Sequence, residues 1–158
     1  MKLKSEVIIE ADRATVWRLF GDPNHLARWQ PSLESVRLVS GIRGQADAVS
    51  ELIYDENGRK VVLTETITAT REPDFVGGTY ASGTASAVVL HRFEDAGDKR
   101  TRWIGHWNYT FNGAMRFVAL LFRRSMQRRV EADMQRFRDF VHAQTATTDQ
   151  KTRSAVTT

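Results

Sequence analysis

The sequence predicts an α+β fold in which a curved antiparallel sheet packs against one long C-terminal helix. Residues 115–143 contain no Pro or Gly and repeat apolar side chains at the helical period of about 3.6 residues. The preceding residues, 33–111, mostly alternate apolar and polar side chains, as half-buried strands do. The 158 residues, 41% of them apolar, are enough for one domain with its own core.

The first expected elements are a strand over residues 3–9 and two short helices. Apolar and charged residues alternate along the strand. Asp12 is in the N-cap position of a helix over residues 15–20. Asp22, which precedes a proline, repeats this start signal and predicts a second helix over residues 24–29.

Six further strands are expected before the long helix. Turn residues and period-2 alternation place them at residues 33–38, 46–54, 61–70, 75–82, 85–94 and 101–111. The Asn57-Gly58 pair is a hairpin signal between two of them. In the strand after this hairpin, Val61, Leu63 and Ile67 share one face and a series of threonines shares the other. One face of the sheet is therefore apolar and needs a cover, and the long helix is the only element of sufficient length.

The long helix carries an apolar stripe and the charge imbalance of the chain. The stripe consists of Met115, Val118, Ala119, Phe122, Met126, Val130, Phe137, Phe140 and Val141. The seven arginines of the helix exceed its acidic residues by four, which equals the net charge of the whole chain, +4. Such arginines often provide solubility alone, and the alternative is attraction to an anionic surface or an acidic partner. Nucleic-acid binding is not expected, because no binding motif is present.

One domain is expected over residues 1–143. Residues 144–158 are polar, lack large apolar side chains and are expected to form a mobile tail. The apolar run near the N-terminus is too short for a signal peptide or a membrane span. The absence of cysteine excludes disulfides and Cys-ligated metals. A cytoplasmic protein is therefore expected.

The segment IEADRATVWRLFGDPNHLARWQP, residues 9–31, resembles the opening of the START-like helix-grip superfamily, in its polyketide cyclase/dehydrase and lipid-transport branch. Gly44, Pro73, Thr101 and the long helix continue the resemblance, which covers about residues 3–142. It implies a helix-grip fold: a seven-stranded curved antiparallel sheet around the C-terminal helix, with two short helices after the first strand. It also implies a hydrophobic cavity between sheet and helix. Members of the superfamily bind sterols, lipids, quinones or polyketides, and some catalyse aromatase or cyclase reactions.

If the apolar faces point inward, residues from most elements line this cavity. They are Trp29, Leu63, Glu65, Tyr80, His91, Trp103, Trp107, Tyr109, Phe122, Met126, Val130 and Asp133. Ordinary core packing accounts equally well for any single aromatic or methionine among them. The cavity is favoured by the set as a whole, because one helix of ~10 Å diameter cannot fill the concave side of seven strands.

Three polar residues stand in apolar surroundings. Glu65 shares the face of Leu63, and Asp133 falls within the stripe with Arg129 as its expected i,i+4 partner. His91 lies on an otherwise apolar strand face. These groups are expected to orient the polar end of an apolar ligand, or to act as acids or bases with raised pKa. The alternatives are that both carboxylates reach solvent and that His91 is a core histidine with a hydrogen bond.

Phe117, Leu120 and Leu121 point away from the stripe and precede two arginines. They predict an exposed apolar patch that contacts an anionic membrane surface or a second copy of the chain. Burial under a loop is the alternative.

The expected function is the binding or transport of a hydrophobic small molecule or lipid. The alternative is a cyclase, aromatase or dehydratase of the polyketide type that uses the same cavity, and a third possibility is an interaction module that docks through its basic helix. Motifs of the common hydrolases and nucleotide-binding proteins are absent, and the four histidines are scattered. No metal, no cofactor and no nucleic acid is therefore expected, and the sequence identifies no catalytic residue.

Overall fold

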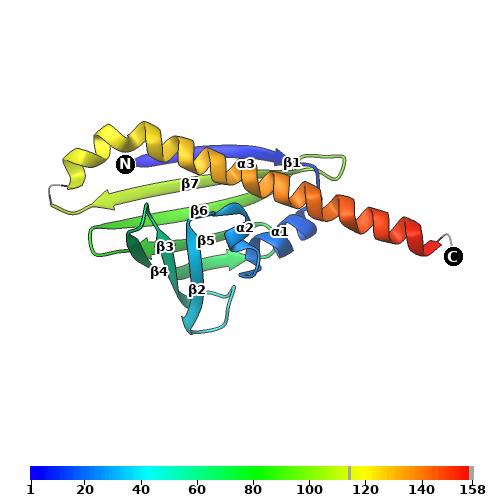
Figure 1. The fold of residues 1–158 in the computed structure, drawn as a ribbon, viewed down its shortest axis with the longest axis horizontal. Helices are drawn as coiled ribbons and strands as arrows, with labels where there is room; N and C mark the ends of the chain where they lie inside the picture. Colours follow the sequence, from blue (N-terminus) through cyan, green and yellow to red (C-terminus); the bar gives the residue numbers. More distant parts are fainter. Residues whose placement is uncertain (114, 157–158) are drawn as a thin grey trace.

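The computed structural model describes the backbone of residues 1–113 and 115–156, and the side chains of residues 1–113 and 121–148. Within them, Figure 1 shows a sheet with one long helix along it and two short helices. The strands are β1 (Lys2–Ile9), β2 (Leu33–Ser40), β3 (Val49–Asp55), β4 (Lys60–Arg71), β5 (Phe75–Ala81), β6 (Ala85–Asp95) and β7 (Thr101–Phe111). The helices are α1 (Arg13–Gly21), α2 (Leu26–Trp29) and α3 (Met115–Val156).

The seven strands form one antiparallel sheet in the order β1-β7-β6-β5-β4-β3-β2. Each strand from β2 to β7 pairs with its neighbour in sequence, and β1 joins the sheet beside β7. This confirms the predicted α+β fold, a seven-stranded antiparallel sheet with a long C-terminal helix. Strands β1 and β2 are the two edges.

Of the two helix caps predicted before β2, one is confirmed and one is wrong. Asp12 caps α1 as expected, because its Oδ1 accepts a hydrogen bond from the backbone N–H of Thr15 at 2.9 Å. Asp22 does not cap a helix. Its Oδ1 accepts from the N–H of Asn24 at 2.9 Å, so the chain makes a turn there and α2 begins only at Leu26.

The helix α3 is 42 residues long and continues to Val156, through residues that the composition predicts to be a mobile tail. No proline or glycine interrupts it, and the hydroxyls of Thr145 and Thr147 donate to the carbonyls of Val141 and Ala143, four residues earlier. Its C-terminal end extends past the sheet (Figure 1). The predicted end of the helix is therefore wrong, while the domain boundary at residue 143 stays a prediction.

Residues at or near both edges of the sheet bind side chains of α3. At the β1 edge, Gln127 Nε2 donates to the carbonyl oxygen of Lys4 at 3.1 Å. Near the opposite edge, Arg129 donates to both carboxylate oxygens of Glu56, at 2.8 and 2.5 Å, and to Ser32 Oγ at 2.7 Å. Ser32 precedes β2 and Glu56 lies in the β3–β4 hairpin. Since Gln127 and Arg129 are only two residues apart, the sheet curves around the helix.

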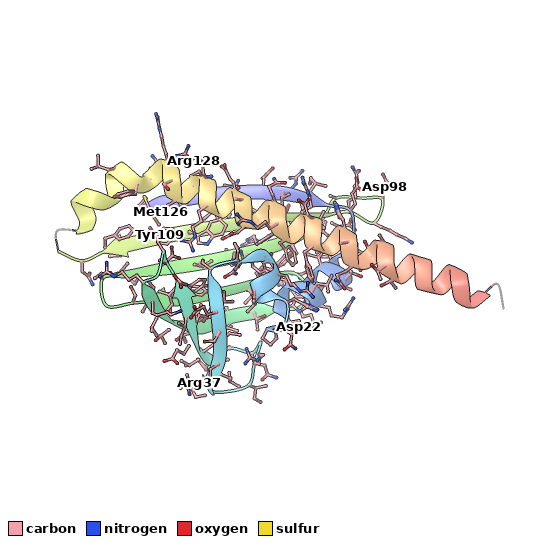
Figure 2. The ribbon with its side chains drawn as sticks, viewed as in Figure 1. Asp22, Arg37, Asp98, Tyr109, Met126 and Arg128 are labelled. Atoms are coloured by element: carbon pink, nitrogen blue, oxygen red, sulfur yellow. The ribbon has the colours of Figure 1, made fainter. Side chains whose placement is uncertain are left out.

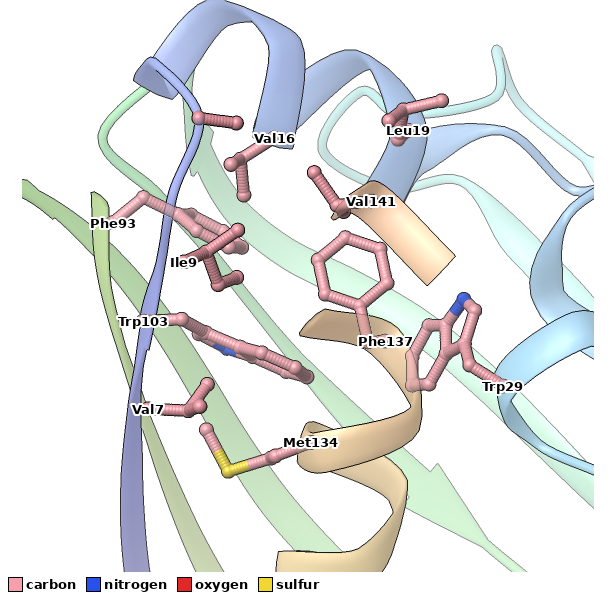
Figure 3. Close-up of a cluster of buried hydrophobic side chains, with 11 residues drawn as sticks. Val7, Ile9, Val16, Leu19, Trp29, Phe93, Trp103, Met134, Phe137 and Val141 are labelled. Carbon is pink, nitrogen blue, oxygen red and sulfur yellow. The ribbon is translucent and has the colours of Figure 1, made fainter. Parts of the chain in front are cut away.

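The hydrophobic core lies between the sheet and α3, where the helix passes α1 and α2 (Figure 3). Its buried residues are Val7, Ile9, Ala11, Val16, Leu19, Trp29, Phe93, Trp103, Met134, Phe137 and Val141. Their rings pack edge to face, with Trp103 and Phe137 centroids 5.2 Å apart. Among the described helices, none is long and apolar enough to cross a membrane.

Candidate functional site

The strand register places one polar row across the inner face of the sheet. Glu65 on β4 lies opposite Tyr80 on β5, Tyr80 lies opposite Ala87 on β6, and Ala87 lies opposite Tyr109 on β7. Directly opposed residues share a face of an antiparallel sheet. Because Leu63 is opposed to the buried Leu52, the same register confirms that Glu65 and Leu63 share the inner, apolar face.

The backbone of the described part of α3 comes closest to β1, β7, α1 and α2. The inner side chains of those strands include small residues such as Ala87 and half-buried ones such as Leu63, Glu65 and Tyr80. Figure 2 shows Met126 on the side of α3 that faces β7. The helix therefore lies nearest to the β1–β7 side of the inner surface.

Glu65 and Tyr80 form a hydrogen-bonded pair on this surface, in which Tyr80 Oη donates to Glu65 Oε1. Burial raises the pKa of the Glu65 carboxyl, and the bond from Tyr80 and the positive charge of Arg43 oppose this only in part. Burial, together with the neighbouring Glu65 carboxylate, raises the pKa of the Tyr80 phenol well above its usual value. The pair therefore combines a phenol that remains protonated with a carboxyl group whose ionisation is made costly by burial.

Two more tyrosines belong to the same surroundings. Burial raises the pKa of Tyr109 to about 12, and Asp133 adds to the effect while Arg129 opposes it. Tyr54 Oη donates to Gln30 Oε1 at 2.7 Å, and burial followed by the charge of Glu65 raises the pKa of Tyr54. The charges of Glu65 on β4 and of Arg129 and Asp133 on α3 thus affect the pKa values of tyrosines on β3 and β7. All these groups therefore border a common region.

The expected pairing of Arg129 with Asp133 is wrong. Asp133 accepts from Arg136 Nη1 at 2.6 Å, whereas Arg129 reaches across to Glu56. Two hydrogen bonds to a carboxylate outside the helix are stronger than one contact along it. Burial still raises the pKa of the half-buried Asp133 carboxyl, against the charges of Arg129 and Arg136.

His91 lies between the polar row and the core. Its Nδ1 accepts a hydrogen bond from Trp103 Nε1 at 3.2 Å, and its ring contacts Phe20 and Trp107 at centroid distances of 5.1 and 5.4 Å. Burial, with a small contribution from His106, lowers the pKa of His91 to about 3. The imidazole is therefore neutral at pH 7, as in a core histidine with a hydrogen bond, and a role in a binding site stays a prediction.

Two of the predicted tryptophans, Trp29 and Trp103, belong to the filled core. Trp29 is 5% exposed and stacks on Phe20 at 5.7 Å, and Trp103 is 1% exposed. Trp107 is half-buried and folds over Gly105, where an added Cβ would lie 2.1 Å from the indole Cη2. Only glycine at that position lets the indole lie flat on β7.

The remaining predicted site residues lie along α3. Met126 and Val130 are half-buried, and Phe122, one turn before Met126, is 55% exposed. Among the described residues, α3 is thus less covered at this end than at the end that carries Phe137. Leu121 is 83% exposed, whereas the side chains of Phe117 and Leu120 lie outside the described residues.

Sequence reasoning missed two residues of this region. Tyr54 follows Leu52 by two positions on β3 and therefore shares its face, a signal that the alternation carries. Met134 is buried in the core and lies four residues after Val130, at helical spacing. The bond between Arg129 and Glu56 has no such signal, because it depends on the curvature of the whole sheet.

Solved structures share this architecture. The chain aligns over 90% of its length with 98% of TTHA0849 from Thermus thermophilus (21% identity, TM-score 0.75). It aligns over 90% with 93% of the Zhui aromatase/cyclase from Streptomyces sp. R1128 (15% identity, TM-score 0.75), and over 88% with 98% of a START superfamily protein from Mycobacterium smegmatis (12% identity, TM-score 0.69). At these identities the likeness shows the fold alone. No curated protein matches the sequence.

A family model gives the stronger result. The model of the polyketide cyclase / dehydrase and lipid transport family matches residues 1–141, which include every strand, both short helices and the part of α3 that packs on the sheet. The chain therefore belongs to the polyketide cyclase / dehydrase and lipid transport family.

Proposed function

We propose that the protein binds or transports a hydrophobic small molecule or lipid between α3 and the inner face of β4 to β7. The observation that carries the proposal is the polar row of Glu65, Tyr80 and Tyr109 on the otherwise apolar inner face of the sheet. An apolar site with a few convergent polar groups is the usual form of a small-molecule site. Membership of the family supports the same class of function.

The side chains divide into two proposed roles. Leu63, Trp107, Met126 and Val130 are half-buried and supply contacts for the apolar body of the ligand. Glu65, Tyr80 and Tyr109, with Asp133 at the edge, orient its polar end. Phenols that remain protonated, beside carboxyls with raised pKa, suit a hydroxyl or carbonyl group better than a second carboxylate.

Two neighbouring residues of β4 provide a matched test. Leu63 lies on the inner face and Val62, 48% exposed, on the outer face. We expect saturable binding of a neutral apolar dye by the wild-type protein. Leu63→Trp should weaken it at least ~10-fold, because the indole occupies the proposed site, whereas Val62→Trp should leave it unchanged; a tenfold change corresponds to about 1.4 kcal/mol.

Organic extraction of the purified protein, followed by mass spectrometry, identifies any ligand that co-purifies. Absence of both an extracted ligand and saturable dye binding would rule out the proposal. Equal loss of binding in the Leu63 and Val62 variants would place the dye elsewhere on the molecule.

A second candidate function is a cyclase, aromatase or dehydratase acting on a polyketide-like substrate in the same site. The Glu65–Tyr80 pair favours it, since a carboxyl with raised pKa beside a phenol is a reasonable acid/base couple. In that case Glu65→Gln and Tyr80→Phe should abolish turnover of a poly-β-ketone substrate while dye affinity remains within about twofold. Turnover that survives both substitutions would exclude these two residues as its acid and base.

The remaining expectations belong to the same proposal. Phe117, Leu120 and Leu121 contact an anionic membrane surface or a second copy of the chain. The domain comprises residues 1–143, and the protein acts in the cytoplasm.

A further inference from the structure

A basic hollow of about 930 Å³ lies between β1 and the first described turns of α3. Five cations border it: Lys2 and Lys4 from β1, and Arg123, Arg124 and Arg128 from α3. None of the described lining residues is acidic. The hydrogen bond from Gln127 to the carbonyl of Lys4 holds the helix against the strand edge, so residues about 120 positions apart form one cationic surface.

The charges of this hollow are not neutralised within the described part of the chain, because none of the five cations makes an ion pair there. Other arginines of the same helix do pair: Arg129 with Glu56, Arg136 with Asp133 and Arg138 with Asp139. Five unpaired cations around one depression produce a positive potential that attracts anions.

Exposed apolar residues adjoin the cations. Leu121, 83% exposed, precedes Arg124 by three residues and Arg128 by seven, so all three share one helix face. Phe122, 55% exposed, is next to Leu121. Arg128 lies on the outer side of α3, opposite Met126, which faces the sheet (Figure 2). Apolar side chains beside lysines and arginines are typical of surfaces that lie in the headgroup region of a bilayer.

We infer that this hollow, together with Leu121, is a docking surface for an anionic lipid bilayer. Lipid phosphates enter the hollow between Lys2, Lys4 and the arginines of α3, and Leu121 inserts among the acyl chains. Each lysine or arginine near such a membrane adds to the electrostatic attraction, so five are sufficient for reversible attachment. The inference is independent of the proposed ligand site, because none of these cations borders the inner face of β4 to β6.

Vesicle sedimentation with the full chain tests it. We expect the protein to pellet with phosphatidylcholine vesicles that contain phosphatidylglycerol, and to remain in the supernatant with phosphatidylcholine alone. Arg123→Gln with Arg124→Gln should weaken binding about 30-fold, as expected when two such charges are removed. Leu121→Ser should also weaken it. The matched control is Arg59→Gln with Arg102→Gln, two exposed arginines outside the hollow, which should bind like the wild type.

Four outcomes would overturn the inference. The first is equal binding to both vesicle types, and the second is an equal loss of binding in the control variant. The third is release of the protein by inorganic phosphate but not by chloride at the same ionic strength, which would indicate a site for free phosphate. The fourth is a change of oligomeric state in Leu121→Ser without vesicles, which would assign the apolar residues to a contact between copies. The arginine variants should still bind the apolar dye. Loss of vesicle binding with dye binding retained would show that the membrane-docking surface and the proposed ligand site are separate.

Discussion

At the scale of single residues, burial on the inner face raises the pKa of acidic groups and lowers that of a histidine. The carboxyls of Glu65 and Asp133 have raised pKa values because burial disfavours their anions. His91 has a lowered pKa because burial disfavours its cation. In all three groups burial therefore shifts the protonation equilibrium toward the neutral form relative to water, which suits a surface that contacts an apolar molecule.

His91 predicts a specific dependence of stability on pH. Its pKa is about 3 in the folded protein and about 6.5 in the unfolded chain, so between these values only the unfolded chain binds the proton. Stability therefore decreases as the pH falls through this window, by about 2 kcal/mol between pH 7.5 and pH 5. Glu65 and Asp133 act in the opposite direction, because their raised pKa values let the folded protein bind protons first.

The substitution His91→Gln isolates this contribution. Glutamine does not titrate and retains an acceptor for Trp103 Nε1. Denaturant unfolding at pH 7.5 and pH 5 measures the free energy of unfolding. In the variant, the decrease in this free energy that is attributed to His91 should be absent. The control is His106→Gln, an exposed position on β7. The same pH dependence in His91→Gln and in the wild type would show that His91 is protonated in the folded state.

The limits of sequence reasoning at this scale follow from the same residues. The alternation along β4 predicted correctly that Glu65 shares the inner face with Leu63, because side-chain direction in a strand follows directly from position. The partner of Asp133, Arg136, stands at the local spacing i,i+3, but the partner of Arg129 could not be predicted in this way. Which neighbour an arginine chooses depends on what lies opposite it in space, and for Arg129 this is Glu56, 73 residues away.

At the scale of elements, one side chain links α3 to the far part of the sheet. Arg129 holds both oxygens of Glu56 and the hydroxyl of Ser32, and so joins the helix to the β3–β4 hairpin and to the start of β2. These are the elements farthest from β1 in the order of the sheet. The link stabilises the curved form of the sheet around the helix.

A double-mutant cycle with Arg129→Ala and Glu56→Ala measures this link. The Arg129 side chain is 48% exposed, so solvent screens the pair, and we expect a coupling of about 0.5–1 kcal/mol in denaturant unfolding. Either substitution should also accelerate dye release. The Arg138–Asp139 pair, which joins adjacent residues of one helix, is the control and should show no effect on dye release. Additive effects of the two substitutions on stability would show that the pair makes no net contribution.

The elements also show where local patterns are sufficient. The strands β4 to β7 and the α1 cap follow from alternation and capping, which act over a few residues. The end of α3 does not, because composition predicts a polar tail whereas the helix continues in the absence of a proline or glycine. The contact of α3 with the β1 edge depends on pairs more than 100 residues apart.

At the scale of the whole molecule, the two ends of the sheet–helix interface differ. At one end, Trp29, Trp103 and Phe137 are at most 5% exposed and the rings fill the interior. At the other, Met126 and Val130 are half-buried and Phe122 is 55% exposed. The first end provides the cooperative core, and the second, with fewer buried apolar contacts, is expected to open more readily.

Hydrogen exchange should resolve this difference along the chain. We expect the slowest amides in β1, β6 and β7 around Trp103 and in residues 134–141 of α3, and faster exchange in β2, β3 and residues 121–130. A dye or extracted ligand at about 100 times its dissociation constant should slow the faster set by up to about 100-fold. The slow set should change less, because it already reports global unfolding.

The pattern of protection distinguishes a site on the inner face from other modes of binding. A ligand between α3 and β4 to β7 should slow exchange both in residues 121–130 of α3 and in the strands opposite them. A molecule bound only at the surface of β1 should leave the exchange rates of β4 and β5 unchanged. Leu63→Trp should reproduce part of the ligand's protection without any ligand, because its indole occupies the same region. Uniform exchange along the chain, or protection confined to the Trp103 end, would contradict an interior with one filled and one open end.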